Sequence, residues 1–230
     1  MKKIKFFISL LFVLVCTVIG SYGIINAPAS DQSELEQELR RNEQALCQEE
    51  SPSDACIQPE HTSALPEQSP TPTDGPEDMI SVIGDSVFLG AAPAFKKLQN
   101  NVTIDAKISR QVYQGLDVAK KLKKKNKLGK IVIISLGTNG KFNPATGQEL
   151  IDYLGTDRTV YWVNAYGKEL EFQKEVNQTI REMAKKNRNV HLITWADEAK
   201  KHPDWFYQDG IHLNAAGQNG FAKFIQNEIR

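Results

Sequence analysis

The sequence has few cysteines, and their positions exclude several kinds of chemistry. Only three of the 230 residues are cysteine, and none follows Cys56. The long C-terminal part therefore has no thiol that could act as a nucleophile. No group of Cys and His residues has the spacing of a metal site, and Gly84 to Gly90 lacks the lysine of a phosphate-binding loop. The sequence predicts neither a metal ion nor a cofactor.

Net charge is also absent, but the charges are unevenly distributed. Residues 1–30 contain three lysines and no acid, and residues 31–78 contain 13 acids and two arginines. Residues 79–230 then carry 23 lysines and arginines against 15 acids. The lysine run from Lys120 to Lys127 covers the outer face and the end of an amphipathic helix pattern, with no aromatic residues between the lysines. Nucleic acid is therefore not a predicted partner.

Only one long apolar run is present, near the N-terminus. The twenty residues from Phe6 to Ile25 are uncharged, which at 1.5 Å per residue is about the thickness of the hydrocarbon core. The lysines before this run favour a cytoplasmic start, while Ala27 and Ala29 fit a signal-peptidase site. We therefore expect an exported protein. Residues 1–25 either anchor it in the membrane with the rest outside, or are removed by cleavage near Ala29.

The next segment, residues 26–78, has the composition of a disordered stalk. It holds seven of the ten prolines and 13 acidic residues against two arginines, so it has little to bury. Three leucines between Ser33 and Cys47 lie near helical spacing and allow one short helix. Cys47 and Cys56 either pair in an oxidising compartment or remain free thiols.

Residues 79–230 alternate short apolar runs with longer amphipathic ones, which predicts one domain with a parallel sheet covered by helices on both faces. Ser86 and Asn139 each follow an expected strand, so topology brings them to one edge of the sheet. The expected strands are Ile80–Ile83, Val102–Asp105, Ile131–Leu136, Thr159–Asn164 and Val190–Trp195, and the expected helices are Phe88–Leu98, Val112–Lys125, Thr146–Leu154, Glu169–Lys186 and Ala215–Ile229.

The chemistry-bearing residues form three small polar motifs. Asp209 precedes His212 by three residues in an expected loop, so one loop supplies a base and a carboxylate to orient it. The other three histidines lie in the stalk, within a strand and before a proline. Ser86 is the nucleophile that such a base activates. The side chain of Asn139 and the backbone N–H of Ser86 are candidate donors to an oxyanion.

These motifs resemble the first, third and fifth sequence blocks of the SGNH (GDSL-type) hydrolases. Longer matches resemble one branch, the extracytoplasmic C-terminal domain of peptidoglycan O-acetyltransferases. The resemblance covers residues 79–230 and implies a flavodoxin-like three-layer α/β/α fold with about five parallel strands. It also implies acetyl transfer to the C6 hydroxyl of muramoyl residues through an acetyl-Ser86 intermediate. The strings that carry it are Val82-Ile83-Gly84-Asp85-Ser86-Val87, Ser109-Arg110-Gln111, Leu136-Gly137-Thr138-Asn139-Gly140 and Trp205-Phe206-x-x-Asp209-Gly210-Ile211-His212-Leu213-Asn214.

The sequence departs from the family pattern at the second block, which usually supplies a glycine to the oxyanion site. Ser109 stands about where that glycine would be, so its backbone N–H is a candidate third donor. Gly115 is a less favoured substitute.

Three functions are compatible with these residues. The leading expectation is acetyl transfer to cell-wall glycan. Since the sequence has a single long apolar run, we expect a separate multi-helix membrane protein to supply the acetyl groups, or an existing ester to do so. An O-acetyl esterase would use the same residues with water as the acceptor. A catalytically silent wall-binding module is the third hypothesis, supported by the basic charge of residues 79–230.

Overall fold

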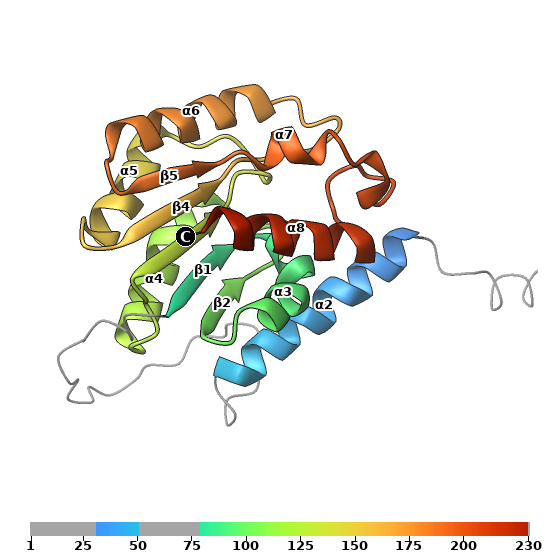
Figure 1. The fold of residues 1–230 in the computed structure, drawn as a ribbon, viewed down its shortest axis with the longest axis horizontal. Coiled ribbons are helices and arrows are strands. Elements are labelled where there is room, and N and C mark those ends of the chain that lie inside the picture. Colours follow the sequence, from blue (N-terminus) through green and yellow to red (C-terminus); the bar gives the residue numbers. More distant parts are fainter. Residues whose placement is uncertain (1–30, 51–78, 230) are drawn as a thin grey trace, which may run out of the picture. The chain divides into compact units, whose positions relative to one another are not determined.

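The computed structural model describes residues 31–50 and 79–229 (Figure 1). The chain divides into two compact units, and Leu35–Arg230 is the unit to which the following description refers. Residues 1–25, the expected membrane or signal segment, lie outside the described residues. Residues 26–30 and 51–78 of the expected stalk lie outside them too. Among the helices that are described, none is both long and apolar enough to cross a membrane.

A five-stranded sheet forms the centre of the domain, with all strands parallel and in the order β2-β1-β3-β4-β5. The middle strands are buried along nearly their whole length, as their apolar sequences require. Gly84 is in register with Ala106 on one side and Ser135 on the other, so three strands end at one edge. The strands are β1 (Ile80–Gly84), β2 (Val102–Ala106), β3 (Ile131–Ser135), β4 (Thr159–Val163) and β5 (Val190–Ile193).

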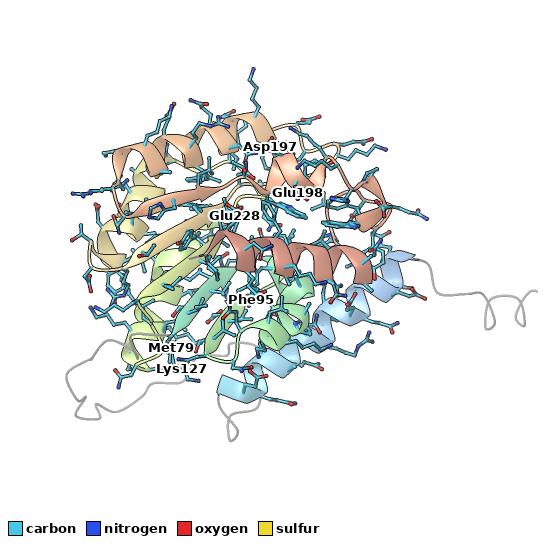
Figure 2. All side chains as sticks on the ribbon, viewed as in Figure 1. Met79, Phe95, Lys127, Asp197, Glu198 and Glu228 are labelled. Atoms are coloured by element: carbon cyan, nitrogen blue, oxygen red, sulfur yellow. The ribbon has the colours of Figure 1, made fainter. Side chains whose placement is uncertain are left out.

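Helices cover both faces of this sheet and divide the core into two clusters of apolar side chains. The helices α3 (Ser86–Leu98) and α8 (Ala215–Glu228) pack on one face, and Figure 2 shows Phe95 of α3 in this layer. The helices α4 (Gly115–Lys124), α5 (Pro144–Leu154) and α6 (Gln173–Lys186) pack on the other. The predicted three-layer α/β/α fold is confirmed, and the expected elements match these within a few residues.

Two short helical elements were not predicted: the 3₁₀ turn η2 (Pro203–Trp205) and the helix α7 (Trp195–Ala199). The helix expected over Val112–Lys125 begins with a 3₁₀ turn, η1 (Val112–Gln114), before α4. The prediction that the last strand reaches Trp195 is wrong, because β5 ends at Ile193. Trp195 instead begins α7, and its ring packs edge-on against Phe221 of α8 at a centroid distance of 4.8 Å. Burial of this large ring favours a helical turn over a longer strand.

Part of the expected stalk is a helix packed on the domain. Within residues 26–78, the helix α2 (Asp31–Glu50) contains the short helix that the leucine spacing allowed between Ser33 and Cys47, and it extends beyond that range at both ends. Its three leucines, Leu35, Leu39 and Leu46, are buried in the same cluster as α3 and α8. Cys47 of α2 is in a disulfide whose partner lies outside the described residues, so pairing with Cys56 stays a prediction.

Candidate active site

The nucleophile candidate lies where β1 turns directly into α3. Asp85 caps the helix, since its carboxylate accepts a hydrogen bond from the backbone N–H of Val87 at 3.0 Å. Ser86 is the first residue of α3 and is 5% exposed. Backbone N–H groups in a first turn have no partner within the helix. The N–H of Ser86 is thus available at the positive end of α3.

Asp85 also joins this turn to the loop that follows β3. The hydroxyl of Thr138 donates to the second carboxylate oxygen of Asp85. Burial raises the pKa of Asp85 above its usual value, and hydrogen bonds from Thr138 and Val87, with the charge of His212, offset part of this effect. Asp85 is therefore a buried residue whose hydrogen bonds link the first motif to the third.

Ser86, His212 and Asp209 are hydrogen-bonded in series. The sequence predicted that these three residues would lie together. His212 Nε2 lies 2.9 Å from Ser86 Oγ, and His212 Nδ1 lies 2.6 Å from Asp209 Oδ2. Asp209 Oδ1 accepts from the backbone N–H groups of Ile211 and His212. Burial acts to raise the pKa of Asp209, but the hydrogen bonds from His212 and Ile211 outweigh it and lower the pKa. A charged Asp209 thus orients the imidazole toward Ser86.

The loop that carries Asp209 and His212 is closed on itself. The backbone N–H of Tyr207 donates to the carbonyl of His212 at 2.9 Å. Gly210 has a φ of 65°, and a Cβ at this position would lie 2.6 Å from Cβ of Lys168. Glycine is therefore required between Asp209 and His212 both for its backbone conformation and for space.

The loop after β3 holds Asn139 against the loop after β2. The side-chain amide of Asn139 donates to the carbonyl of Arg110 at 3.3 Å and to the hydroxyl of Thr138 at 3.4 Å. In return, the side chain of Gln111 donates to the carbonyl of Asn139. The second and third motifs are thus bound to each other as well as to the nucleophile turn.

Arg110 is a buried residue of this site to which we assigned no role from the sequence. Its guanidinium donates to the carbonyl of Gly84 at 3.0 Å and to the Asp105 carboxylate at 2.6 Å. Burial acts to raise the pKa of Asp105, but the charge of Arg110 and the contact with Lys121 hold it below its usual value. Arg110 follows Asp105 by five positions, which matches the period of neither a helix nor a strand. Only the resemblance of Ser109-Arg110-Gln111 to the family therefore marked this position.

The structure separates the two candidates for the third oxyanion donor. Ser109 lies in the loop that Arg110 anchors. Its φ is 58°, in the left-handed region that glycine adopts without steric cost. Gly115 instead begins α4, where an added Cβ would lie 2.8 Å from Leu150 of α5. Gly115 therefore serves close packing of two helices, and Ser109 remains the candidate.

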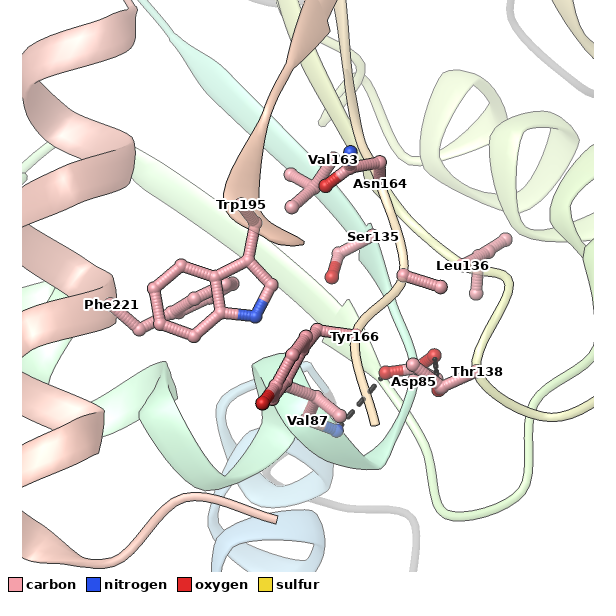
Figure 3. A pocket seen from close by; sticks show the side chains of 11 residues that line it. Asp85, Val87, Ser135, Leu136, Thr138, Val163, Asn164, Tyr166, Trp195 and Phe221 are labelled. Atoms are coloured by element: carbon pink, nitrogen blue, oxygen red, sulfur yellow. Dashed lines mark hydrogen bonds between the residues drawn. The ribbon is translucent and has the colours of Figure 1, made fainter. Parts of the chain in front are cut away.

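A small pocket opens beside the nucleophile turn (Figure 3). Asp85, Ser135 and Thr138 contribute polar groups to its wall, while Tyr166, Trp195 and Phe221 contribute aromatic rings. Within residues 31–50 and 79–229, no group of three or more His, Cys, Asp and Glu side chains could hold a metal ion.

The fold and the site together define a class: three-layer α/β proteins with a Ser–His–Asp arrangement at the carboxyl edge of a parallel sheet. YrhL of Bacillus subtilis, provisionally named as a peptidoglycan O-acetyltransferase, is 33% identical over 164 residues, which are 71% of this chain and 25% of YrhL. O-acetyltransferase OatA of Staphylococcus aureus is 35% identical over 145 residues, covering 63% of this chain and 24% of OatA. The chain therefore spans about a quarter of the length of these relatives.

Solved structures agree on the fold. The C-terminal catalytic domain of Streptococcus pneumoniae peptidoglycan O-acetyltransferase A matches with a TM-score of 0.59 and 24% identity, over 68% of this chain and 93% of that domain. An acetyl esterase matches with a TM-score of 0.54 and 14% identity, over 66% and 95% of the two chains. No family model matches the sequence. The relatives above and the order of the motifs show that the chain belongs to the SGNH (GDSL-type) family, and the solved structures agree with this in fold.

Proposed function

We propose that residues 79–230 catalyse serine-dependent transfer of an acetyl group to cell-wall glycan, at the C6 hydroxyl of muramoyl residues. The observation that carries the proposal is the series of hydrogen bonds from Asp209 through His212 to Ser86. These three residues lie at the carboxyl edge of the sheet, beside Asn139. Parallel α/β folds bind their ligands at this edge. The name of OatA supports O-acetyl transfer, and that of YrhL supports peptidoglycan as the acceptor.

In the first half of the reaction, Ser86 takes the acetyl group. His212 Nε2 accepts the proton of Ser86 Oγ as this oxygen attacks the acetyl carbonyl carbon. The backbone N–H of Ser86 and the amide of Asn139 hold the resulting oxyanion, with the N–H of Ser109 as a third donor. The bond to the donor alcohol then breaks, and this alcohol leaves with the proton from His212. Acetyl-Ser86 remains.

Asn139 is suited to this role because its present contacts are weak. Its amide donates at 3.3 Å and 3.4 Å, longer than the usual separation of about 2.9 Å. These contacts keep the amide near the site, and one of them is exchanged for the charged oxygen when it forms. A hydrogen bond to an ionised acceptor is stronger than one to a neutral carbonyl.

In the second half, a sugar hydroxyl takes the acetyl group. His212 accepts the proton of this hydroxyl as its oxygen attacks the acetyl-Ser86 carbonyl, and the same donors hold the oxyanion. The bond to Ser86 Oγ then breaks, and His212 returns the proton to Ser86. Water in place of the sugar would give free acetate, which is the reaction of an O-acetyl esterase. The second candidate function is therefore esterase activity at the same site.

The setting that we propose is outside the cytoplasmic membrane. Residues 1–25 would hold the domain at the membrane, or would be removed near Ala29 on secretion. A transferase on that side needs an acetyl ester delivered to it, and we propose a separate multi-helix membrane protein as the supplier. Peptidoglycan is the acceptor, and the basic charge of residues 79–230 supports attraction to anionic wall polymers.

Two measurements on the full-length chain in detergent micelles test the proposal. Ser86→Ala should lower hydrolysis of a chromogenic acetate ester by about 10³-fold or more, and equal rates would remove Ser86 from the mechanism. With an acetyl ester and saturating muropeptide oligomers, wild type should produce acetylated glycan. Release of acetate alone would overturn the transferase and leave the esterase.

A further inference from the structure

A proline inside α3 leaves one backbone carbonyl in need of a donor. Pro93 has no N–H group, so it cannot donate to the carbonyl of Leu89 four residues earlier. Leu89 is fully buried, and a buried carbonyl without a donor is destabilising. The side-chain amide of Asn42, on α2, donates to this carbonyl at 3.2 Å and also lies 3.4 Å from the carbonyl of Gly90. Asn42 thus supplies the hydrogen bond that Pro93 removes.

One turn earlier on α2, Glu38 contacts the loop that carries the base. Its carboxylate accepts from the side-chain amide of Gln218 at 2.8 Å and from the hydroxyl of Tyr207 at 3.2 Å. The Gln218 amide also donates to the carbonyl of Leu213, which follows His212 in the chain. Tyr207 in turn donates its backbone N–H to the carbonyl of His212. Glu38 therefore supports this loop through two residues.

The apolar face of α2 keeps these two side chains in place. Leu35, Leu39 and Leu46 are buried in the core cluster of α3 and α8. The spacings of three and four residues put Glu38 and Asn42 on the same face as the leucines. Leu39 packs directly over Gly90 of α3, where an added Cβ would be in ordinary van der Waals contact with the leucine side chain at 3.7 Å.

We propose that α2 is part of the catalytic unit, with Glu38 and Asn42 as positioning residues. Asn42 secures the helix that begins at Ser86, and Glu38 secures the loop that carries His212. One helix thus connects both sides of the 2.9 Å contact between Ser86 and His212. The inference rests on the proposed function for its catalytic consequence, because displacement of a catalytic group by about 1 Å can cost 10²-fold in rate.

The contact with Asn42 can be tested by unfolding alone. In the full-length chain, Asn42→Ala should lower the melting temperature by about 4 °C, as expected for one unsatisfied buried carbonyl. In a Pro93→Ala background the new N–H satisfies Leu89, so the same substitution should cost less than half as much. Gln44→Ala, on the exposed face of α2, is the control and should change nothing. Equal losses in both backgrounds would contradict the pairing of Asn42 with Pro93.

The contact with Glu38 can be tested by kinetics on the same full-length chain. Glu38→Ala should lower kcat for an acetate ester about tenfold while KM changes less than about twofold. Glu38→Gln keeps an acceptor oxygen and should recover part of the loss. Glu36→Ala, which removes an exposed pair with Arg40 only, should match wild type. If Glu38→Ala also matches wild type, Glu38 is not a positioning residue. If Ser86→Ala retains activity, the proposed function fails, while the unfolding test with Pro93→Ala still decides the role of α2.

Discussion

The two sides of the Ser86–His212 contact are held in different ways. Ser86 and its neighbour Asp85 are 5% and 1% exposed, between a buried strand and the first turn of a buried helix. The side chains of His212 and Asp209 are 22% and 39% exposed, on a loop without regular structure apart from a single bridge. The nucleophile is therefore fixed by the core, whereas the base is fixed by a few hydrogen bonds.

Because the two sides are held differently, substitutions on them should affect stability and activity differently. Substitutions around Ser86 break buried contacts, so they should lower stability together with activity. Substitutions in the loop of His212 break exposed contacts, which contribute little to stability, and they should lower activity alone. The contacts from Glu38 of α2 are the exception, because they link the exposed loop to buried helices.

The largest expected effect on activity without loss of stability is that of Asp209→Asn. The substituted amide can no longer offset the charge on His212 and can hold the wrong tautomer of the ring, so kcat should fall by about 10³-fold. The melting temperature should change little, since the side chain is 39% exposed. Asp197→Asn, on the exposed surface of α7, is the matched control and should retain full activity. A large loss of stability in Asp209→Asn would contradict the separation.

The pH dependence of stability should have opposite signs on the two sides. The pKa of Asp85 is raised in the folded state, so its favourable contribution is present at low pH and is lost as the pH rises through the folded value. The pKa of Asp209 is lowered, so its contribution is present above the usual value of 3.8 and is lost as the pH falls through the folded value.

Urea unfolding from about pH 3 to about pH 7 measures both effects. Relative to Asp85→Asn, wild type should become less stable as the pH rises. Relative to Asp209→Asn, wild type should become more stable over the acid part of this range. Two slopes of the same sign would show that the two carboxyl groups do not differ in the way that their burial indicates.

Much of the fold and the central part of the site could be predicted from the sequence. The apolar run Ile131–Ile134 indicated a buried parallel strand, and the structure has it in β3. Because parallel strands end at one edge, the positions of Ser86 and Asn139 after their strands placed them together. The Asp209–His212 spacing fits a single loop, in which the two side chains are indeed hydrogen-bonded. These features depend on short stretches of chain.

The remaining features depend on pairs of residues far apart in the sequence. Asn42 meets the carbonyl of Leu89 across 47 positions, and no local pattern identifies which carbonyl a proline leaves free. The leucines of α2 lie in an acidic, proline-rich segment whose composition predicted disorder, and their spacing allowed only a short helix. The partner surface on α3 and α8 that stabilises this helix is formed by residues far away in the sequence. Arg110 was missed because its role depends on the folded structure. There its guanidinium forms a buried contact with the Asp105 carboxylate.

The smallest expected effect concerns Ser109, on the nucleophile side. Its φ of 58° is a left-handed conformation, which costs a non-glycine residue about 1 kcal/mol or more. Ser109→Gly relieves this cost but gives the unfolded chain more freedom. The net result should be a rise in melting temperature of about 2 °C or less. Since the backbone N–H remains, kcat for an acetate ester should not change.

Asn126→Gly provides the matched control for this substitution, because Asn126 also has a positive φ, 54°, and follows α4. Asparagine tolerates that conformation better than serine, so the gain in stability should be smaller, again with unchanged kcat. A fall in kcat for Ser109→Gly alone would mean that the hydroxyl of Ser109, and not only its N–H, takes part in the site. In that case the nucleophile side would depend on a side chain at the very position where the family usually has none.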